Sequence, residues 1–310
     1  MSAKTSQIIE GGPVAAPSVV AAPRPGKGIV LLLAALVLFT LMDAAAKHLG
    51  ARYHPAQVVW ARFAVNSLIL LAIFGPRVRR LIHSTQPGTQ VLRALSQLAT
   101  VILFFGAIRY IGLAEAAALT DLNPVLITLG AALFLGEKLG PRRLIGIGVA
   151  FAGAMIILRP GVGVMHPAAL LALAAAFSYS AGALLTRVVR ADGLATSMLW
   201  SALIGTTLSS LAVPFFWQPI ALPDLWIFAA VGILGTAGQG LLIRAFSVAE
   251  AGTLAPFGYT GLVFSSVWGF VFFGQLPDGW TVLGAAVIVA AGIYIWMRER
   301  QVAKAADRNS

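Results

Sequence analysis

Cysteine is absent from this 310-residue chain, and charged residues are scarce. Without cysteine the protein has no disulfide framework, no zinc–thiolate site and no thiol chemistry. Charged residues make up 11% of the chain and apolar residues 59%. Soluble domains contain about 25% charged and roughly 45–50% apolar residues. A chain of this length cannot bury such an apolar excess in a water-soluble core, so the composition indicates an integral membrane protein.

Enzyme motifs are also absent. The four histidines form no H-E-x-x-H pattern, and the chain contains no G-x-x-x-x-G-K-[ST] phosphate loop. Asp43 and Asp121 lie within apolar segments and could suggest an aspartyl protease of the membrane. However, they follow Leu-Met and Leu-Thr, whereas the aspartates of those enzymes follow Tyr or Gly-x-Gly. We therefore expect neither an enzyme nor a bound cofactor or metal.

Acidic residues are half as frequent as basic ones, with 11 Asp and Glu against 22 Lys and Arg. The basic residues lie mostly in short loops, so the net charge of +11 indicates membrane topology and not a nucleic-acid partner. With a cytoplasmic N-terminus, 17 of the 22 basic residues fall on the inner side of the membrane and 4 on the outer side. This imbalance predicts that both termini are cytoplasmic.

Ten apolar segments, each near the ~20 residues that cross a bilayer, occupy most of the chain. We expect them at about 28–49, 55–74, 91–111, 114–135, 142–158, 167–189, 194–214, 224–247, 251–273 and 279–297. Prolines interrupt every apolar run in residues 1–27, which excludes a typical signal peptide and predicts a disordered cytoplasmic tail. Residues 298–310 are predicted to form a second cytoplasmic tail.

The chain repeats itself at a spacing of 135 residues. Residues 108–119 read IRYIGLAEAAAL and residues 243–254 read IRAFSVAEAGTL, with six of the twelve positions identical. The segments FLGEKLGP and FFGQLP similarly precede the fifth and tenth apolar segments. We therefore predict two halves, residues 28–160 and 161–297, each with five spans. Because five is odd, the second half must be inverted relative to the first.

The chain resembles the EamA type of the drug/metabolite transporter superfamily. The resemblance rests on the ten spans in two halves, the AEA motif after the third and eighth spans, and the FLGEKL and FFGQLP segments. The resemblance covers about 28–297. It implies two EamA repeats, a location in the cell inner membrane, and movement of small metabolites without ATP hydrolysis. Candidate substrates by resemblance are riboflavin, S-adenosylmethionine, amino acids and their derivatives, and amphipathic drugs. Gln275 departs from the pattern, since the family often has Glu there, as at Glu137.

Three charged side chains are predicted within the first half of the membrane-spanning region. Asp43, Arg62 and Asp121 each lie six or seven residues from the outer end of their spans, which places them ~10 Å deep at 1.5 Å per residue. One interpretation is a charged layer that lines a cavity, with Arg62 holding an anionic group and Asp43 or Asp121 carrying a coupling proton. The alternative is an Asp–Arg pair that only fastens the helices together.

Two spans contain signs of interruption at matched places. Asn123-Pro124 lies within the fourth span, and Pro256 lies shortly before Tyr259 in the ninth. Interrupted helices at corresponding positions of two halves indicate a transport site, so Asn123 and Tyr259 are added as candidate substrate-binding residues. The alternative is a simple kink, because membrane helices that pack against neighbours tolerate proline.

The sequence therefore predicts an all-α membrane protein with ten transmembrane helices in two inverted five-helix repeats. We expect a secondary transporter that works by alternating access on a small-molecule metabolite, with a site lined by spans 1, 2, 4, 6 and 9. A passive channel-like facilitator and, less favoured, an intramembrane enzyme are the alternatives. Small-residue rows at Gly146, Ala150 and Ala154, and at Ala168, Ala172, Ala176 and Ser180, indicate internal packing or a homodimer.

Overall fold

The computed structural model describes residues 25–136, 140–159 and 166–308. Glu137 and most of the predicted N-terminal tail lie outside the described residues. Throughout the described part the chain is helical and contains no strand. The predicted all-α fold is therefore confirmed.

Helices of the first half lie in the following order: α1 (Pro25–Gly50), α2 (Pro55–Phe74), η1 (Gly75–Arg77), α3 (Val78–Leu81), α4 (Pro87–Ile108), α5 (Leu113–Thr120), α6 (Asn123–Leu135) and α7 (Pro141–Leu158). Those of the second half are α8 (Ala168–Val188), η2 (Arg190–Asp192), α9 (Leu194–Ala212), η3 (Val213–Phe216), η4 (Leu222–Asp224), α10 (Leu225–Val248), α11 (Ala251–Gly258), α12 (Thr260–Phe273) and α13 (Gly279–Arg308). Together the described elements form ten segments long and apolar enough to cross a membrane, as predicted.

Local sequence explains where several of these helices begin and end. Prolines open α2, α4 and α7, where the missing N–H has no helical partner to lose. The His54 Nδ1 atom accepts a hydrogen bond from the Ala56 N–H at 3.3 Å and caps α2. Gly136 and Gly274 end α6 and α12 in the left-handed conformation, with φ of 72° and 64°. These two glycines occupy corresponding places in the two halves.

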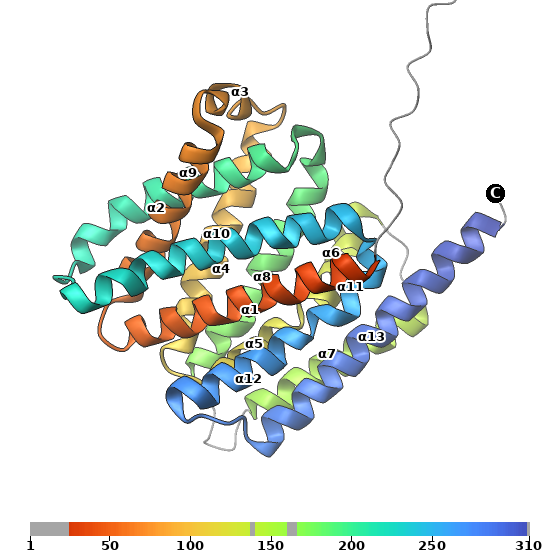
Figure 1. Ribbon diagram of the computed structural model, residues 1–310. Helices are drawn as coiled ribbons and strands as arrows, with labels where there is room; N and C mark the ends of the chain where they lie inside the picture. The colour runs from red at the N-terminus through yellow and green to blue at the C-terminus, as the bar shows by residue number, and fades with distance from the viewer. Residues whose placement is uncertain (1–24, 137–139, 160–165, 309–310) are drawn as a thin grey trace, which may run out of the picture.

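The helices pack between the halves in matched pairs (Figure 1). Helix α1 packs against α10, and α8, which occupies the place of α1 in the second half, packs against α4. The pairs α2 with α9 and α7 with α13 each join equivalent helices, and the two broken spans meet where α5 packs against α12. A two-fold rotation that exchanges the halves produces this pattern. The two halves therefore form one interleaved bundle instead of two separate domains.

The ends of α1 show that the halves are inverted. At one end Gly28 lies directly against Ala249, which precedes Glu250 of the second AEA motif. At the other end Lys47 Nζ donates hydrogen bonds to the carbonyls of Ile108 and Ile111, next to the first AEA motif, at 2.6 and 2.5 Å. Helix α1 has 26 residues and is therefore ~39 Å long at 1.5 Å per residue. The two motifs therefore lie at opposite ends of the molecule.

The small-residue rows pack inside the bundle. Gly146, Ala150 and Ala154 are buried on α7, and α7 packs against α13. A Cβ added to Gly284 of α13 would lie 2.6 Å from the Gly153 carbonyl oxygen, so the two backbones are in direct contact. The row on α8 is likewise buried, at Ala168, Ala172, Ala176 and Ser180. The internal-packing interpretation is thus confirmed for both rows.

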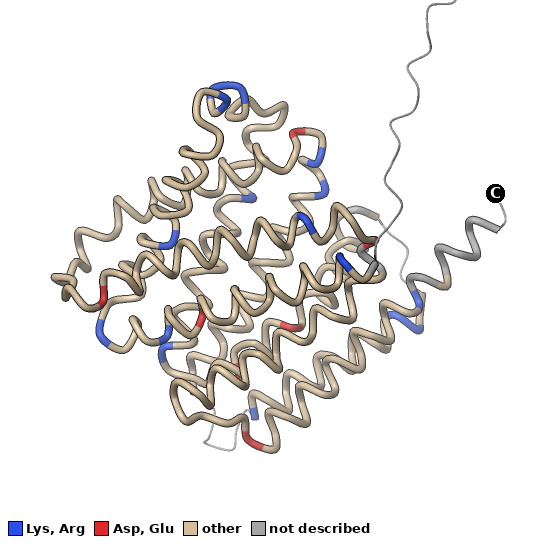
Figure 2. Tube along the Cα trace, in the orientation of Figure 1, with Lys and Arg blue, Asp and Glu red and all other residues tan. Residues whose placement is uncertain are grey.

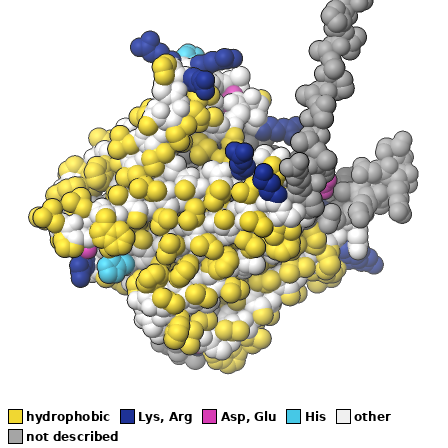
Figure 3. Space-filling view, in the orientation of Figure 1, with side chains coloured by type: hydrophobic (Ala, Val, Ile, Leu, Met, Phe, Trp, Pro, Cys, Tyr) yellow, Lys and Arg dark blue, Asp and Glu magenta, His cyan; other side chains and the backbone are white. Residues whose placement is uncertain are grey.

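The outer surface of the helices is apolar. Large hydrophobic side chains such as Leu133, Phe134 and Phe215 are 69%, 80% and 84% exposed. Hydrophobic side chains cover most of the face shown in Figure 3, and the basic side chains lie mostly toward its rim. Figure 2 shows that most charged residues lie near helix ends. Such a surface suits the hydrocarbon core of a bilayer, and the chain is a multi-pass membrane protein.

Candidate functional site

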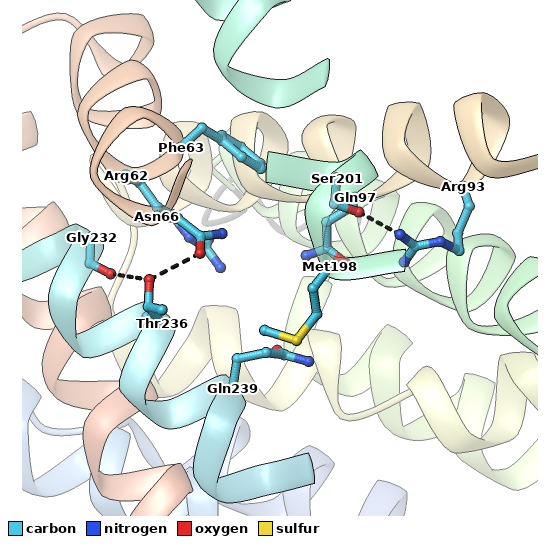
Figure 4. Close-up of a pocket in the computed structure, with 11 residues that line it drawn as sticks. Arg62, Phe63, Asn66, Arg93, Gln97, Met198, Ser201, Gly232, Thr236 and Gln239 are labelled. Carbon is cyan, nitrogen blue, oxygen red and sulfur yellow. Dashed lines mark hydrogen bonds between the residues drawn. The ribbon is translucent and has the colours of Figure 1, made fainter. Parts of the chain in front are cut away.

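A cavity lies between α2, α4, α9 and α10, and Figure 4 shows its lining. Its empty volume is about 540 Å³, including the part that is open to the outside. Its lining residues come from spans of both halves: Arg62, Phe63, Asn66, Arg93, Gln97, Met198, Ser201, Gly232, Gly235, Thr236 and Gln239. The sequence predicted a site lined by spans 1, 2, 4, 6 and 9, but this cavity is lined by spans 2, 3, 7 and 8.

Three glycines on α10 let α1 and α2 approach closely enough to form this cavity. A Cβ added to Gly232 would lie 2.3 Å from the Cβ of Val65 on α2. A Cβ on Gly235 would lie 2.8 Å from the Met42 Sδ atom on α1 and 3.7 Å from the Arg62 Nε atom. Gly238 meets the Phe39 ring in the same way. Larger residues at these positions would separate the helices and move Arg62.

Arg62 is the central charged residue of the lining. Its guanidinium carbon lies 5.5 Å from the centre of the Phe105 ring and 5.9 Å from that of the Phe63 ring. Both distances fall within the range of a cation–π interaction. Among the described residues, no hydrogen-bond acceptor or carboxylate pairs directly with the guanidinium; the ion pairs within 4.0 Å are Arg52 with Asp224 and Arg159 with Asp278. Arg62 therefore presents free N–H donors to the cavity.

Arg93 is held in a different way. Its Nε atom donates to the Gln90 side-chain oxygen at 3.1 Å, and its terminal nitrogen donates to the Ser201 hydroxyl at 2.8 Å and to the Ser197 carbonyl. All three acceptors are uncharged, so they fix the orientation of Arg93 without neutralising it. A further polar contact joins α2 to α10, where the Thr236 hydroxyl donates to the Asn66 side-chain oxygen at 3.0 Å. Figure 4 shows the Ser201 and Thr236 contacts as dashed lines.

Asp43 lies on α1 close enough to Arg62 for their charges to interact. The two residues form no ion pair within 4.0 Å, and Asp43 does not belong to the cavity lining. The predicted neighbourhood of Asp43 and Arg62 is therefore present, whereas a tight Asp–Arg pair that fastens the helices is not.

Asp121, Asn123 and Tyr259 form a second group of polar side chains. Asp121 follows the last residue of α5, Asn123 begins α6, and Tyr259 separates α11 from α12. The charge of Asp121 acts on Tyr259. Three buried atoms of this group have no hydrogen-bond partner in the described part of the protein, namely Asp121 Oδ2, Asn123 Oδ1 and Tyr259 OH.

Of the charged layer predicted for Asp43, Arg62 and Asp121, the cavity lining therefore contains Arg62 alone. Residue counting gives the depth of a side chain, but the direction it faces depends on the path of its helix. The span that contains Asp121 is broken immediately after this residue, at Leu122, and α5 and α6 pack against α8 and α12. That position brings Asp121 near Tyr259 of the second broken span.

Both broken spans have the same construction. An eight-residue helix comes first in each case, α5 in one half and α11 in the other, and a longer helix follows the break. The predicted interruption at matched positions is therefore confirmed. Tyr259 OH also lies against α13, since a Cβ added to Gly292 would be 1.8 Å from this oxygen.

Polar clusters close the bundle at both ends of α2. At its N-terminal end, the Asp224 carboxylate accepts hydrogen bonds from Tyr53 OH at 2.8 Å and from Arg52 at 3.3 Å. We call Arg52, Tyr53 and Asp224 the Asp224 cluster. Beside it, the Gln57 side chain bonds to the backbone of Gln218 through both of its polar atoms, at 2.9 and 3.2 Å.

The opposite end carries the Asp192 cluster, which comprises Ser84, Thr85, Gln90 and Asp192. The Asp192 carboxylate accepts from the Ser84 hydroxyl, from the Thr85 N–H and hydroxyl at 2.9 and 2.6 Å, and from the Gln90 amide at 3.0 Å. These donors, that of Ser84 first, hold the pKa of Asp192 well below its usual range. The Asp224 cluster joins the loop between spans 1 and 2 to the loop between spans 7 and 8. The Asp192 cluster joins the loop between spans 6 and 7 to the loop between spans 2 and 3, which is the equivalent arrangement with the halves exchanged.

Several lining residues escaped the sequence analysis, among them Asn66, Gln97 and Gln239. Amide side chains within apolar spans were a usable signal, since such residues tend to face protein or a cavity and not lipid. Thr236 and Gln239 also lie three residues apart and so share one face of α10. Arg93 was assigned to the inner boundary as a topology signal, although the structure buries it in α4.

Comparison with known proteins shows which family shares this architecture. The model of the family described as "EamA-like transporter family" matches residues 26–159 and again residues 166–297. The chain is 29% identical over 272 residues to the pseudopaline exporter CntI of Pseudomonas aeruginosa, covering 86% of this chain and 94% of that protein.

Two other relatives and a solved structure add to the comparison. The S-adenosylmethionine uptake transporter of Rickettsia bellii is 28% identical over 284 residues, which cover 88% of this chain and 94% of that one. The riboflavin transporter of Vibrio cholerae is 26% identical over 293 residues, with coverage of 90% and 98%. A crystal structure with 20% identity superposes with a TM-score of 0.56, covers 89% of this chain and 99% of its own, and supports the fold alone. Because the family model accounts for both five-span halves, the chain belongs to the EamA-like transporter family.

Proposed function

We propose that this membrane transporter moves a small polar or amphipathic metabolite across the cell inner membrane by alternating access. The cavity at the junction of the two halves carries the proposal, because it combines a free arginine with neutral polar groups inside an apolar bundle. The relatives carry names of different substrates, which are a pseudopaline, S-adenosylmethionine and riboflavin. At 26–29% identity these names make riboflavin and S-adenosylmethionine candidates to test, together with amino acids and their derivatives.

The inverted arrangement of the halves supports alternating access. The Asp224 cluster and the Asp192 cluster close opposite ends of the same four spans. The acidic residue of each cluster comes from the second half, but it lies between the second and third spans of that half in one cluster and between the first and second spans in the other. A rocking motion of one half against the other would open one cluster while it tightened the other. The cavity extends from Arg62 toward Arg93 and Met198, near the N-terminal ends of α4 and α9. The distribution of basic residues assigns that end to the cytoplasm in our proposal, where the Asp192 cluster would form the inner gate.

A coupling role for protons is part of the proposal. Asp43 neighbours the charge of Arg62, and Asp121 belongs to the broken-helix group with unpaired polar atoms. Either carboxylate is placed to exchange a proton when its surroundings change during rocking. Asp43→Asn and Asp121→Asn keep the side-chain shape and remove the titrating group. Loss of pH-driven accumulation with retained exchange would identify the coupling residue, and unchanged accumulation in both variants would contradict proton coupling through these residues.

The passive facilitator is the competing function, and counterflow separates the two. Purified protein in liposomes would be loaded with unlabelled riboflavin, S-adenosylmethionine or an amino acid mixture and diluted into the labelled compound. A transporter gives a saturable, transient overshoot of label for its substrate, because exchange through an alternating site is faster than net flux. A channel-like facilitator lets the label equilibrate without an overshoot, and that result would contradict alternating access.

A further inference from the structure

The charges of the cavity identify a class of substrate, an inference that rests on the proposed transport function. We infer that the substrate binds as an anion and places a carboxylate or phosphate group on the guanidinium of Arg62. The charges and contacts of the groups that surround this guanidinium support the assignment.

All charged residues of the cavity lining are basic. Among the described residues the lining contains Arg62 and Arg93 and no Asp or Glu, and its remaining polar side chains are neutral amides and hydroxyls. Asp43 is the acid whose charge acts on Arg62, and it lies outside the lining. When Asp43 is counted as ionised, the three side chains sum to one positive charge. A substrate with one anionic group would neutralise this charge, and a cationic substrate would meet repulsion from two guanidinium groups.

The two arginines have different roles in this arrangement. Arg93 donates to Gln90, Ser197 and Ser201, so it is a fixed charge whose hydrogen bonds are already used. Arg62 contacts the rings of Phe63 and Phe105 and has no hydrogen-bond acceptor among the described residues. An arginine that lies within a membrane protein without a partner loses solvation that ring contacts restore only in part. A carboxylate or phosphate on its planar fork would supply two charge-assisted hydrogen bonds.

Neighbouring groups favour this position for the anionic end of the substrate. Asn66 follows Arg62 by one helical turn, and its side-chain oxygen is already bonded to Thr236 at 3.0 Å. Phe63 and Phe105 form an apolar wall beside the guanidinium. Toward Arg93 and Met198 the lining offers the amides of Gln97 and Gln239. An anionic group on Arg62 therefore leaves the uncharged remainder of the substrate among amides, a hydroxyl and a thioether.

A retention experiment tests the inference even while the substrate is unidentified. Full-length protein in liposomes would be incubated at pH 7 with water-soluble yeast extract, filtered and analysed by mass spectrometry, with empty liposomes as background. Compounds enriched by the wild-type protein should carry a carboxylate or phosphate. Their enrichment should fall at least ten-fold in Arg62→Gln. It should recover in part in Arg62→Lys, which restores the charge without the bidentate fork.

The matched control is Arg79→Gln, which removes one arginine from α3 outside the cavity and should retain the same compounds as the wild type. If Arg62→Gln cannot be inserted into liposomes, the wild-type protein is tested with the uncharged amide of each enriched acid. The amide should compete with the acid for retention at least ten-fold more weakly than unlabelled acid does. Enrichment of compounds that carry neither a carboxylate nor a phosphate, or full enrichment by Arg62→Gln, would overturn the anion inference. Failure of the wild-type protein to enrich anything would instead contradict the transport function itself.

Discussion

At the scale of single residues, the chain retains charge inside the membrane only at a few positions, each with an identifiable environment. An Asp, Lys or Arg at the centre of a span costs roughly 2.5–3.5 kcal/mol on insertion scales. Arg93 and Lys47 offset that cost with neutral acceptors, three side-chain or backbone groups for Arg93 and two carbonyls for Lys47. Arg62 has ring contacts and the nearby charge of Asp43 but no hydrogen-bond acceptor among the described residues, which is why we assign its free donors to substrate.

The Asp192 cluster gives a prediction for pH dependence. Asp192→Asn removes a charged acceptor from four hydrogen bonds, so its Tm should lie below that of the wild type at pH 7. Because folding lowers the pKa of Asp192, its stabilisation is present above the unfolded pKa, which is about 3.9, and is lost as pH falls through the folded pKa. Thermal unfolding in detergent at several pH values measures the difference.

The Tm difference between wild type and Asp192→Asn should stay constant from pH 8 to pH 5 and narrow at lower pH. Glu250→Gln is the control, because Glu250 is an exposed acid at another corner and its replacement should leave Tm unchanged. A difference that widens on acidification would show that the carboxylate does not stabilise this corner.

The sequence predicted part of the environment of its intramembrane charges. An Asp in apolar span 1 and an Arg in apolar span 2 were expected to face protein. In the structure the charges of Asp43 and Arg62 are close enough to interact. Asp121 has the same signal and yet belongs to another group, because the break in its helix decides which way it faces. Neutral lining residues such as Gln97 were missed, since amides within membrane helices are common enough to have no single meaning.

At the scale of helices, the two broken spans are the most informative elements. Proline at the start of α6 and within α11 interrupts each span, and the long half of each ends on a left-handed glycine. Their existence and position could be predicted from Asn123-Pro124 and Pro256, together with the repeat. The packing of Tyr259 against α13 could not, because it depends on the contact between helices that are distant in sequence.

Gly292→Ala tests that contact. The new Cβ would lie 1.8 Å from Tyr259 OH, so the tyrosine or α13 must move, and we expect a destabilisation of about 1–3 kcal/mol, as for other overpacked cores. Tyr259→Phe in the same chain removes the clashing oxygen and should restore part of the loss. Unfolding in mixed detergent measures the stability of each variant.

Gly148→Ala is the matched control for this substitution, because nothing lies within 4 Å of a Cβ at that position of α7. Equal stability of Gly292→Ala and Gly148→Ala would show that Tyr259 does not occupy the place described.

At the scale of the whole molecule, the repeat and the parity of the spans explain the architecture. Five spans per half require inversion, and the structure places the two AEA motifs at opposite ends of α1. The set of helices around the cavity could not be predicted, because it follows from the exchange of partners between the halves. Spans 2, 3, 7 and 8 are the second and third helices of each half, and the two-fold relation brings them together.

The basic residues predict the orientation of this bundle. Reporter fusions after Ser84 and Arg190 should be cytoplasmic, and a fusion after Gln218 should be periplasmic. These sites sample three corners of the described helices. A periplasmic result at Ser84 together with a cytoplasmic result at Gln218 would reverse the assignment and place the Asp192 cluster on the periplasmic side.

Alternating access itself is tested most directly by locking each end in turn, which the natural absence of cysteine makes clean. Arg52→Cys with Asp224→Cys spans the Asp224 cluster, and Thr85→Cys with Asp192→Cys spans the Asp192 cluster. A bifunctional thiol reagent with a cleavable disulfide would join each pair in liposomes, and counterflow of the identified substrate would be measured before and after reduction. We predict that either cross-link lowers counterflow at least ten-fold and that reduction restores it. Undiminished counterflow with either end locked would contradict the account.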